Sequence, residues 1–222
     1  MFDLHLRRGN LQRLIPFWAS VLLTLFLFHA PVYAQTPTAA QDRVVAQNLM
    51  KDLVDSSWIR DGNGSKIVYL FFDPNCPYCH HVFDSLMKIR KEMPDLQFRW
   101  IPLGMLGSNS TAKAAAIIQA PDPLKAFMTN ERNYGFLNSD TGGGIPPAKH
   151  VDAASQTILD ENLSILQGQN LYGIPVVVFQ ADDGKPFYFS GQRSEAQLRE
   201  ILAHAVAGSF GGGQPIKGQQ NK

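Results

Sequence analysis

An apolar, β-rich heptapeptide, KIVYLFF (residues 66–72), runs directly into the only two cysteines of this 222-residue chain. Its length and composition are typical of a buried central strand. The motif Cys76-x-x-Cys79-His80 follows within a few residues, and a helical pattern of apolar side chains resumes from Cys76. The sequence therefore predicts a strand followed by a helix, with the cysteines at their junction.

The segments that follow complete a mixed α/β pattern. Pro94 ends the helix, and a second strand is expected over residues 96–103. A right-handed β-α-β crossover makes these two strands parallel. Residues 173–180 and 186–191 are typical of an antiparallel hairpin, and Ser194 then caps a last helix. We therefore expect a mixed central sheet with helices on both faces.

The remaining segments surround this sheet in the sequence. Residues 108–168 have a helical pattern and are predicted to form a helical insertion. Residues 35–43 look disordered. An amphipathic helix is expected over residues 44–54, and the turn signal DGNG at residues 61–64 excludes a helix beyond that point. The tail, residues 207–222, is rich in Gly and Gln and is also predicted to be disordered.

The chain begins like an exported protein. A basic N-terminus precedes an apolar run at residues 17–28, which is shorter than the roughly 20 residues that a membrane-spanning helix needs. The sequence VYA at residues 32–34 fits a signal-peptidase site with cleavage before Gln35. Residues 1–34 are therefore predicted to be a signal peptide, with a retained N-terminal anchor as the alternative.

Charge and cysteine content restrict the class of protein. Removing three Arg and one Asp with the signal reduces 20 basic and 19 acidic residues to 17 and 18, a net charge of −1. Such a chain without a basic run gives no reason to expect nucleic-acid binding. Beyond residues 17–28 it has no apolar run long enough to span a membrane, so no stable membrane insertion is expected after cleavage. Two cysteines cannot form a disulfide scaffold, which indicates a chemical role for them.

The cysteine motif fits three kinds of site. Cys76 and Cys79 have the spacing of a redox dithiol, the addition of His80 gives c-type haem attachment, and His80 with His81 can begin a zinc site. Covalent haem needs a helical pocket, whereas a buried strand runs into this motif. A zinc site needs at least three protein ligands, and adjacent histidines on a helix point about 100° apart. Both histidines are therefore interpreted as surface residues.

A redox dithiol fits best, with an inert short-loop disulfide as the alternative. The positive end of a helix favours an anion, so Cys76 ionises more readily there. We expect Cys76 to be exposed and Cys79, one turn below, to be more buried. Pro77 is tolerated in the first helical turn because it has no N–H to lose. Neither a metal nor a cofactor is expected.

The pattern resembles the thioredoxin fold and, within it, the periplasmic thiol:disulfide interchange proteins of the DsbG/DsbC type. The segments that carry the likeness are FFDPNCPYC (71–79), the helical insertion and GIPVVVF (173–179). The resemblance implies a thioredoxin-like domain over residues 66–206. It also implies a periplasmic location, cysteine-containing exported proteins as partners, and a DsbD-type membrane reductant as a further partner.

The resemblance also assigns site residues. It implies that Cys76 and Cys79 are catalytic, with Pro77 and Tyr78 completing the active-site motif. In this fold a cis-proline and the residue before it face the dithiol and bind substrate. By resemblance these two residues are Pro175 and Ile174.

The sequence departs from the family in three places. Residues 35–65 leave room for a linker helix but not for most of the family's N-terminal dimerisation domain, which we therefore expect to be lacking. Ile174 stands where those isomerases have Thr. The buried acid of thioredoxin is replaced by Leu70, and Asp73 is interpreted as a turn or cap residue.

The expected activity is disulfide isomerase or reductase. A DsbA-like thiol oxidase is the main alternative, because no sequence feature fixes the direction of electron flow. A holdase or assembly factor and a c-type cytochrome are further alternatives.

Overall fold

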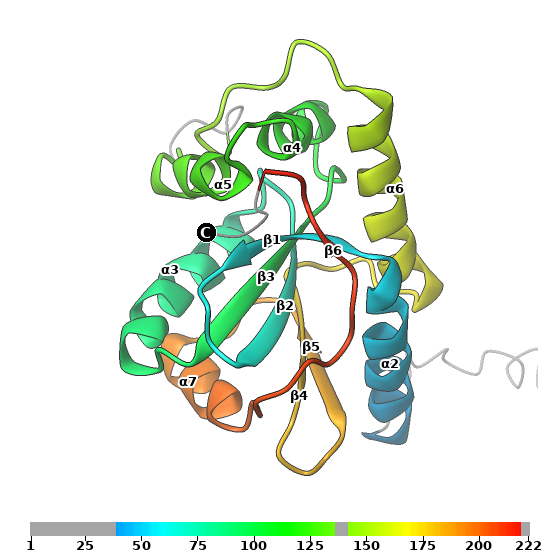
Figure 1. Ribbon diagram of the computed structural model, residues 1–222, viewed down its shortest axis with the longest axis vertical. Helices are drawn as coiled ribbons and strands as arrows, with labels where there is room; N and C mark the ends of the chain where they lie inside the picture. The colour runs from blue at the N-terminus through cyan, green and yellow to red at the C-terminus, as the bar shows by residue number, and fades with distance from the viewer. Residues whose placement is uncertain (1–38, 136–141, 219–222) are drawn as a thin grey trace, which may run out of the picture. The chain divides into compact units, whose positions relative to one another are not determined.

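The computed structural model describes residues 39–135 and 142–218, which belong to one structural unit. The predicted signal peptide, residues 1–34, lies outside the described residues. No helix among those described is both long and apolar enough to cross a membrane. The strands of the sheet follow the order β5-β4-β2-β3-β1-β6 (Figure 1).

The elements have the following bounds. The strands are β1 (Ser57–Asp61), β2 (Lys66–Phe72), β3 (Leu96–Pro102), β4 (Val176–Gln180), β5 (Pro186–Ser190) and β6 (Gln214–Pro215). The helices are α2 (Ala39–Asp52), the 3-10 helix η1 (Leu53–Asp55), α3 (Pro77–Glu92), α4 (Ser110–Ile118), α5 (Pro123–Arg132), α6 (Ala153–Gly168) and α7 (Glu195–Ala203).

The sheet is mixed, as the sequence predicts. β2 runs parallel to β3, whereas β4 pairs antiparallel with both β2 and β5. Helices α3 and α7 lie on one side of the sheet and α2 and α6 on the other (Figure 1). β2 occupies the centre of the sheet, and its last five residues are buried. The cysteine motif therefore starts from the buried end of a central strand.

The N-terminal part differs from its prediction in two ways. Helix α2 begins at Ala39, inside the segment expected to be disordered. A strand that the sequence does not predict then follows the helix: the N–H and hydroxyl of Ser56 both donate to the Leu53 carbonyl, and β1 begins at Ser57. Trp58 and Ile59 are buried there, and antiparallel pairing with β3 satisfies the backbone.

The predicted disordered tail is also wrong for residues 207–218. β6 pairs parallel with β1, and the Trp58 indole N–H donates to the Gly212 carbonyl at 2.9 Å. The glycines permit this approach, because Gly213 has a φ of 75° and a Cβ there would collide with Ser56. Ile216 is 3% exposed and joins the core. The glycine-rich composition predicts disorder, whereas in the structure these glycines let the backbone pack closely.

The helical insertion shares the core of the sheet. Phe127 of α5 is fully buried, and its ring centroid lies 4.7 Å from that of Phe72 and 4.8 Å from that of Trp100. Phe83 of α3 meets the same ring edge to face at 5.6 Å. Because β2, β3, α3 and α5 all contribute to this aromatic cluster, the insertion is packed together with the strand and helix that carry the cysteines.

Replacement of Ile216 by Ala tests the packing of the tail. The substitution leaves a cavity in the core and is expected to lower the free energy of unfolding by about 2–4 kcal/mol. Urea denaturation monitored by circular dichroism measures the loss. Lys217→Ala, at the exposed neighbouring position, is the control and is expected to change stability by less than about 0.5 kcal/mol. Equal stability of the two variants would contradict the packed tail.

Candidate active site

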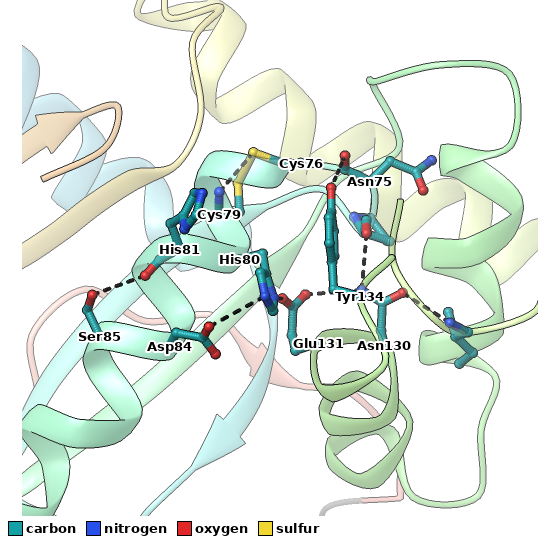
Figure 2. A network of polar contacts seen from close by, with 12 residues as sticks. Asn75, Cys76, Cys79, His80, His81, Asp84, Ser85, Asn130, Glu131 and Tyr134 are labelled. Carbon is teal, nitrogen blue, oxygen red and sulfur yellow. Dashed lines mark hydrogen bonds and ion pairs between the residues drawn. A yellow bond between two sulfur atoms is a disulfide. The ribbon is translucent and has the colours of Figure 1, made fainter. Parts of the chain in front are cut away.

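The two cysteines lie at the start of α3, at the junction that the sequence predicts. Cys76 is the N-cap of the helix, and its sulfur accepts the N–H of Cys79 at 3.1 Å. The two sulfurs are joined in a disulfide (Figure 2). Pro77 occupies the first turn, where no intrahelical N–H is required. The sulfur of Cys76 therefore sits where the helix end and a backbone donor both favour negative charge.

The burial of the pair differs from the expectation. The sequence predicts an exposed Cys76, whereas Cys76 is 1% exposed and Cys79 is 4% exposed. The loop before β4 approaches the first cysteine, because the Ile174 carbonyl oxygen lies 4.0 Å from the Cys76 sulfur. Between the cysteines, Tyr78 is 57% exposed. The motif thus exposes the Tyr78 ring to solvent, whereas both cysteines are buried.

The loop that faces the sulfurs contains a cis peptide bond between Ile174 and Pro175. It is tied to β5 by two hydrogen bonds: the Gly191 N–H donates to the Pro175 carbonyl at 2.8 Å, and the Ser190 hydroxyl donates to the Gly173 carbonyl at 2.9 Å. The structure therefore brings Ile174, one of the two residues assigned by resemblance, to Cys76, and Pro175 follows it in the same loop.

Asp73 fixes the turn between β2 and α3. Its carboxylate accepts the N–H groups of Asn75, Met105 and Leu106 at 2.7–2.9 Å and the hydroxyl of Ser110 at 2.9 Å. Burial raises the pKa of Asp73, and these hydrogen bonds offset part of that rise. This arrangement fits the interpretation of Asp73 as a turn residue. The same carboxylate also joins the cysteine turn to the loop after β3.

Two side chains of the helical insertion also hydrogen-bond to the turn between β2 and α3. Lys113 of α4, itself 3% exposed, donates to the Asn75 side-chain oxygen at 3.0 Å and to the Gly143 carbonyl at 2.7 Å. Asn130 of α5 donates to the Pro74 carbonyl at 3.1 Å. Sequence reasoning missed both residues. The lone lysine in the run AKAAAII was the available signal, because a charge on an otherwise apolar helix needs a buried partner.

His80 is not the surface residue that the sequence suggests. Its side chain is 12% exposed, and its Nδ1 lies 3.1 Å from Oε2 of Glu131, a carboxylate of α5 with 2% exposure. Its Nε2 lies 3.5 Å from Asp84, and its ring stacks on Tyr134 at 4.5 Å. Figure 2 shows the His80 ring directed from the first turn of α3 toward Glu131 and Tyr134. Both ring nitrogens of His80 thus face carboxylates, whereas the haem and zinc interpretations each require one of them to bind a metal.

Burial and the hydrogen bond between His80 and Glu131 shift the pKa of both groups. Burial alone would lower the pKa of His80, but the hydrogen bond and charge of Glu131, helped by Asp84, outweigh it and raise that pKa. Burial raises the pKa of Glu131, and the hydrogen bonds with His80 and Asn130 offset part of the rise. Within the described residues, no group of three or more His, Cys, Asp or Glu side chains is placed to bind a metal.

A cysteine pair at the N-terminus of a helix, facing a cis-proline loop beside a mixed sheet, defines a thioredoxin-fold protein. The family described as "Thioredoxin-like domain" matches residues 60–206, about two thirds of the chain. The chain belongs to this family.

Two named relatives and one solved structure are similar to this chain. Thiol:disulfide interchange protein DsbG of Pseudomonas aeruginosa is 28% identical over 160 residues, which cover 71% of this chain and 60% of that protein. DsbG of Escherichia coli is 25% identical over 71% of this chain and 62% of its own length. The chain thus matches less than two thirds of each relative. A periplasmic thioredoxin-like protein of Salmonella enterica shares the fold, with a TM-score of 0.53 at 19% identity over 76% of this chain and 97% of its own.

The raised pKa of His80 predicts a pH-dependent stability. A histidine whose pKa is higher in the folded state stabilises the fold fully below its unfolded pKa of about 6.5, and this contribution is lost as the pH rises through the folded pKa. The stability difference between wild type and His80→Gln should therefore be largest near pH 5.5 and should shrink toward pH 8.5. Urea midpoints across this range measure it. His81→Gln is the control for removing a histidine from the same helix, and identical behaviour of both variants would refute the assignment.

Replacement of Lys113 by Met tests whether its hydrogen bonds hold the turn between β2 and α3 in place. The change removes two hydrogen bonds of a buried ammonium and leaves the Asn75 and Gly143 oxygens without that donor, so we expect a loss of about 1–3 kcal/mol in unfolding free energy. Lys125→Met, on exposed surface of α5, is the matched control. If both variants denature at the same urea concentration, Lys113 does not hold the turn.

Proposed function

We propose that this protein is a periplasmic thiol-disulfide oxidoreductase that acts as a disulfide isomerase and reductase. The observation that carries the proposal is the Cys76–Cys79 pair at the N-terminus of α3, with the cis-Pro175 loop facing it. In this proposal Cys76 and Cys79 are the catalytic residues. Pro77 and Tyr78 complete the motif, and Ile174 and Pro175 bind substrate.

The reaction proceeds by two thiol-disulfide exchanges. The Cys76 thiolate attacks one sulfur of a substrate disulfide, so that bond breaks, a substrate thiolate leaves and a mixed disulfide forms. The Cys79 thiolate then attacks the Cys76 sulfur, which releases the second substrate thiolate and closes the Cys76–Cys79 disulfide. Two electrons have then passed from the dithiol to the substrate. If a substrate thiolate attacks the mixed disulfide instead, Cys76 is released as thiolate and the substrate is isomerised without net electron transfer.

A substrate sulfenic acid enters the same cycle. Attack by the Cys76 thiolate, with uptake of one proton, forms the mixed disulfide and releases water. Because reduction leaves the enzyme oxidised, repeated cycles need an external dithiol reductant. A membrane reductant of the DsbD type is the proposed source of these electrons.

The proposed substrates are cysteine-containing exported proteins. The backbone of Ile174 pairs with an extended substrate segment as an added strand, which supplies affinity without sequence specificity. Tyr78 and Tyr172, which are 57% and 68% exposed, lie two residues from Cys76 and from Ile174 in the sequence and offer exposed aromatic surface in the motif and in the cis-proline loop. Cysteine-containing segments with neighbouring apolar side chains fit this surface.

Variants of the two cysteines test the chemistry. Cys76→Ser removes the nucleophile and is expected to reduce disulfide reduction and isomerisation by more than about a hundredfold, because a hydroxyl cannot supply the thiolate. Cys79→Ala leaves the nucleophile but removes the resolving thiol. It should accumulate mixed disulfides with periplasmic proteins, visible as reducible bands on non-reducing gels. Near-wild-type turnover by Cys76→Ser would refute the proposal.

The redox state in cells tests the direction of electron flow. An isomerase or reductase must be kept as a dithiol, so rapid acid quenching followed by alkylation should find Cys76 and Cys79 mainly reduced. Deletion of the membrane reductant should convert the pair to the disulfide. A mainly oxidised pair in otherwise wild-type cells would instead indicate a thiol oxidase.

A further inference from the structure

The His80–Glu131 pair touches both ends of the cysteine segment. His80 directly follows Cys79, and its ring stacks on Tyr134 at 4.5 Å. The Tyr134 hydroxyl in turn donates to the carbonyl of Asn75, the residue before Cys76, at 2.7 Å. One contiguous set of contacts therefore runs from the residue after the second cysteine to the residue before the first (Figure 2).

The pair is also unusual in its burial. Glu131 is 2% exposed on a helix whose Phe127 lies in the aromatic cluster, and burying a carboxylate there costs stability unless it is paired. The hydrogen bonds from His80 and from Asn130, at 3.1 and 3.0 Å, provide that pairing. An apolar side chain would fill the same position at lower cost. Placing the charge here favours a protonated His80 within one residue of the dithiol.

We infer that Glu131 and His80 are positioning residues of the dithiol: Glu131 keeps His80 in its imidazolium form, and this cation stabilises the thiolate on which thiol-disulfide exchange depends. The inference rests on the proposed function only in taking the Cys76 thiolate as the reacting group. Glu131 acts through His80, and His80 acts through the electric field that it adds to that of the α3 N-terminus.

Asp84, His81 and Tyr134 also lie near the His80 ring. Asp84 and His81 lie on α3 with it, and Asp84 is 58% exposed, so solvent screens its charge. Tyr134 covers the ring, and burial, together with the charges of Glu131 and Asp73, raises its pKa to about 12, so it stays neutral. Glu131 is therefore the group that controls the proton on His80.

The test measures the ionisation of Cys76 in the reduced protein from the pH dependence of its alkylation by iodoacetamide. A unit charge close to a thiol in a partly buried site changes the pKa of that thiol by about one unit. Both Glu131→Gln and His80→Gln should therefore raise the pKa of the Cys76 thiol by about that amount and slow alkylation at pH 6 by up to about tenfold. Asp84→Asn is the matched carboxylate control, with a shift of a few tenths of a unit at most.

Two further variants separate an electrostatic role from a structural one. The double variant His80→Gln/Glu131→Gln should behave like His80→Gln alone, because Glu131 acts through His80. His80→Lys keeps a positive charge at this position and should retain the low thiol pKa of the wild type. Additive losses in the double variant, or a failure of His80→Lys to rescue, would overturn the inference.

Measurement of the wild-type protein covers the case in which these variants do not fold. If the imidazolium stabilises the thiolate, the thiolate must stabilise the imidazolium by the same free energy. The pKa of His80, followed by NMR, should therefore be higher in the reduced protein than in the disulfide form. Equal values in the two redox states would overturn the inference.

Neither measurement requires turnover of a substrate. A coupled His80 in a protein that fails to reduce or isomerise substrates would overturn the proposed function and leave the inference standing. The converse result, turnover with an uncoupled His80, would do the opposite.

Discussion

The buried carboxylate of Asp73 is the contact on which the geometry of the site depends. It stands at the end of the central strand β2 and accepts four hydrogen bonds, from the turn that leads into α3, from the loop after β3 and from the first residue of α4. Three separate segments thus converge on one side chain. Because the cysteines follow this turn directly, the hydrogen bonds of Asp73 fix the position of the cysteines relative to the sheet.

The insertion is better understood as part of the site than as an addition to it. Asn130 and Lys113 hold Pro74 and Asn75, and Glu131 holds His80, so the polar contacts of α4 and α5 fall on both sides of the cysteines. Phe127 anchors α5 beneath them in the aromatic core. Apolar packing gives the insertion a fixed place, and its polar residues then act on the redox turn from that place.

The sequence predicts the sheet and the cysteine site well because both follow from local patterns. The apolar run of β2 and the helix-start position of Cys76 can be read from neighbouring residues, and the cis-proline loop followed from resemblance. What could not be read are contacts between distant residues. His80 looks like a surface histidine until Glu131, 51 positions later, is brought to it. Strand β1 also was not predicted, because its pairing with β3 joins residues about 40 positions apart in the sequence.

The two ends of the described chain lie at opposite edges of the sheet. Helix α2 packs near the edge strand β5, where Tyr188 donates to Asp42 at 3.1 Å, and the short β6 pairs with β1 at the other edge. An uncovered edge strand is a template for pairing with another chain. In a protein whose proposed substrates are extended polypeptides, β6 occupies the free edge of β1 along Ser57 and Trp58, which leaves that stretch unavailable to a substrate strand.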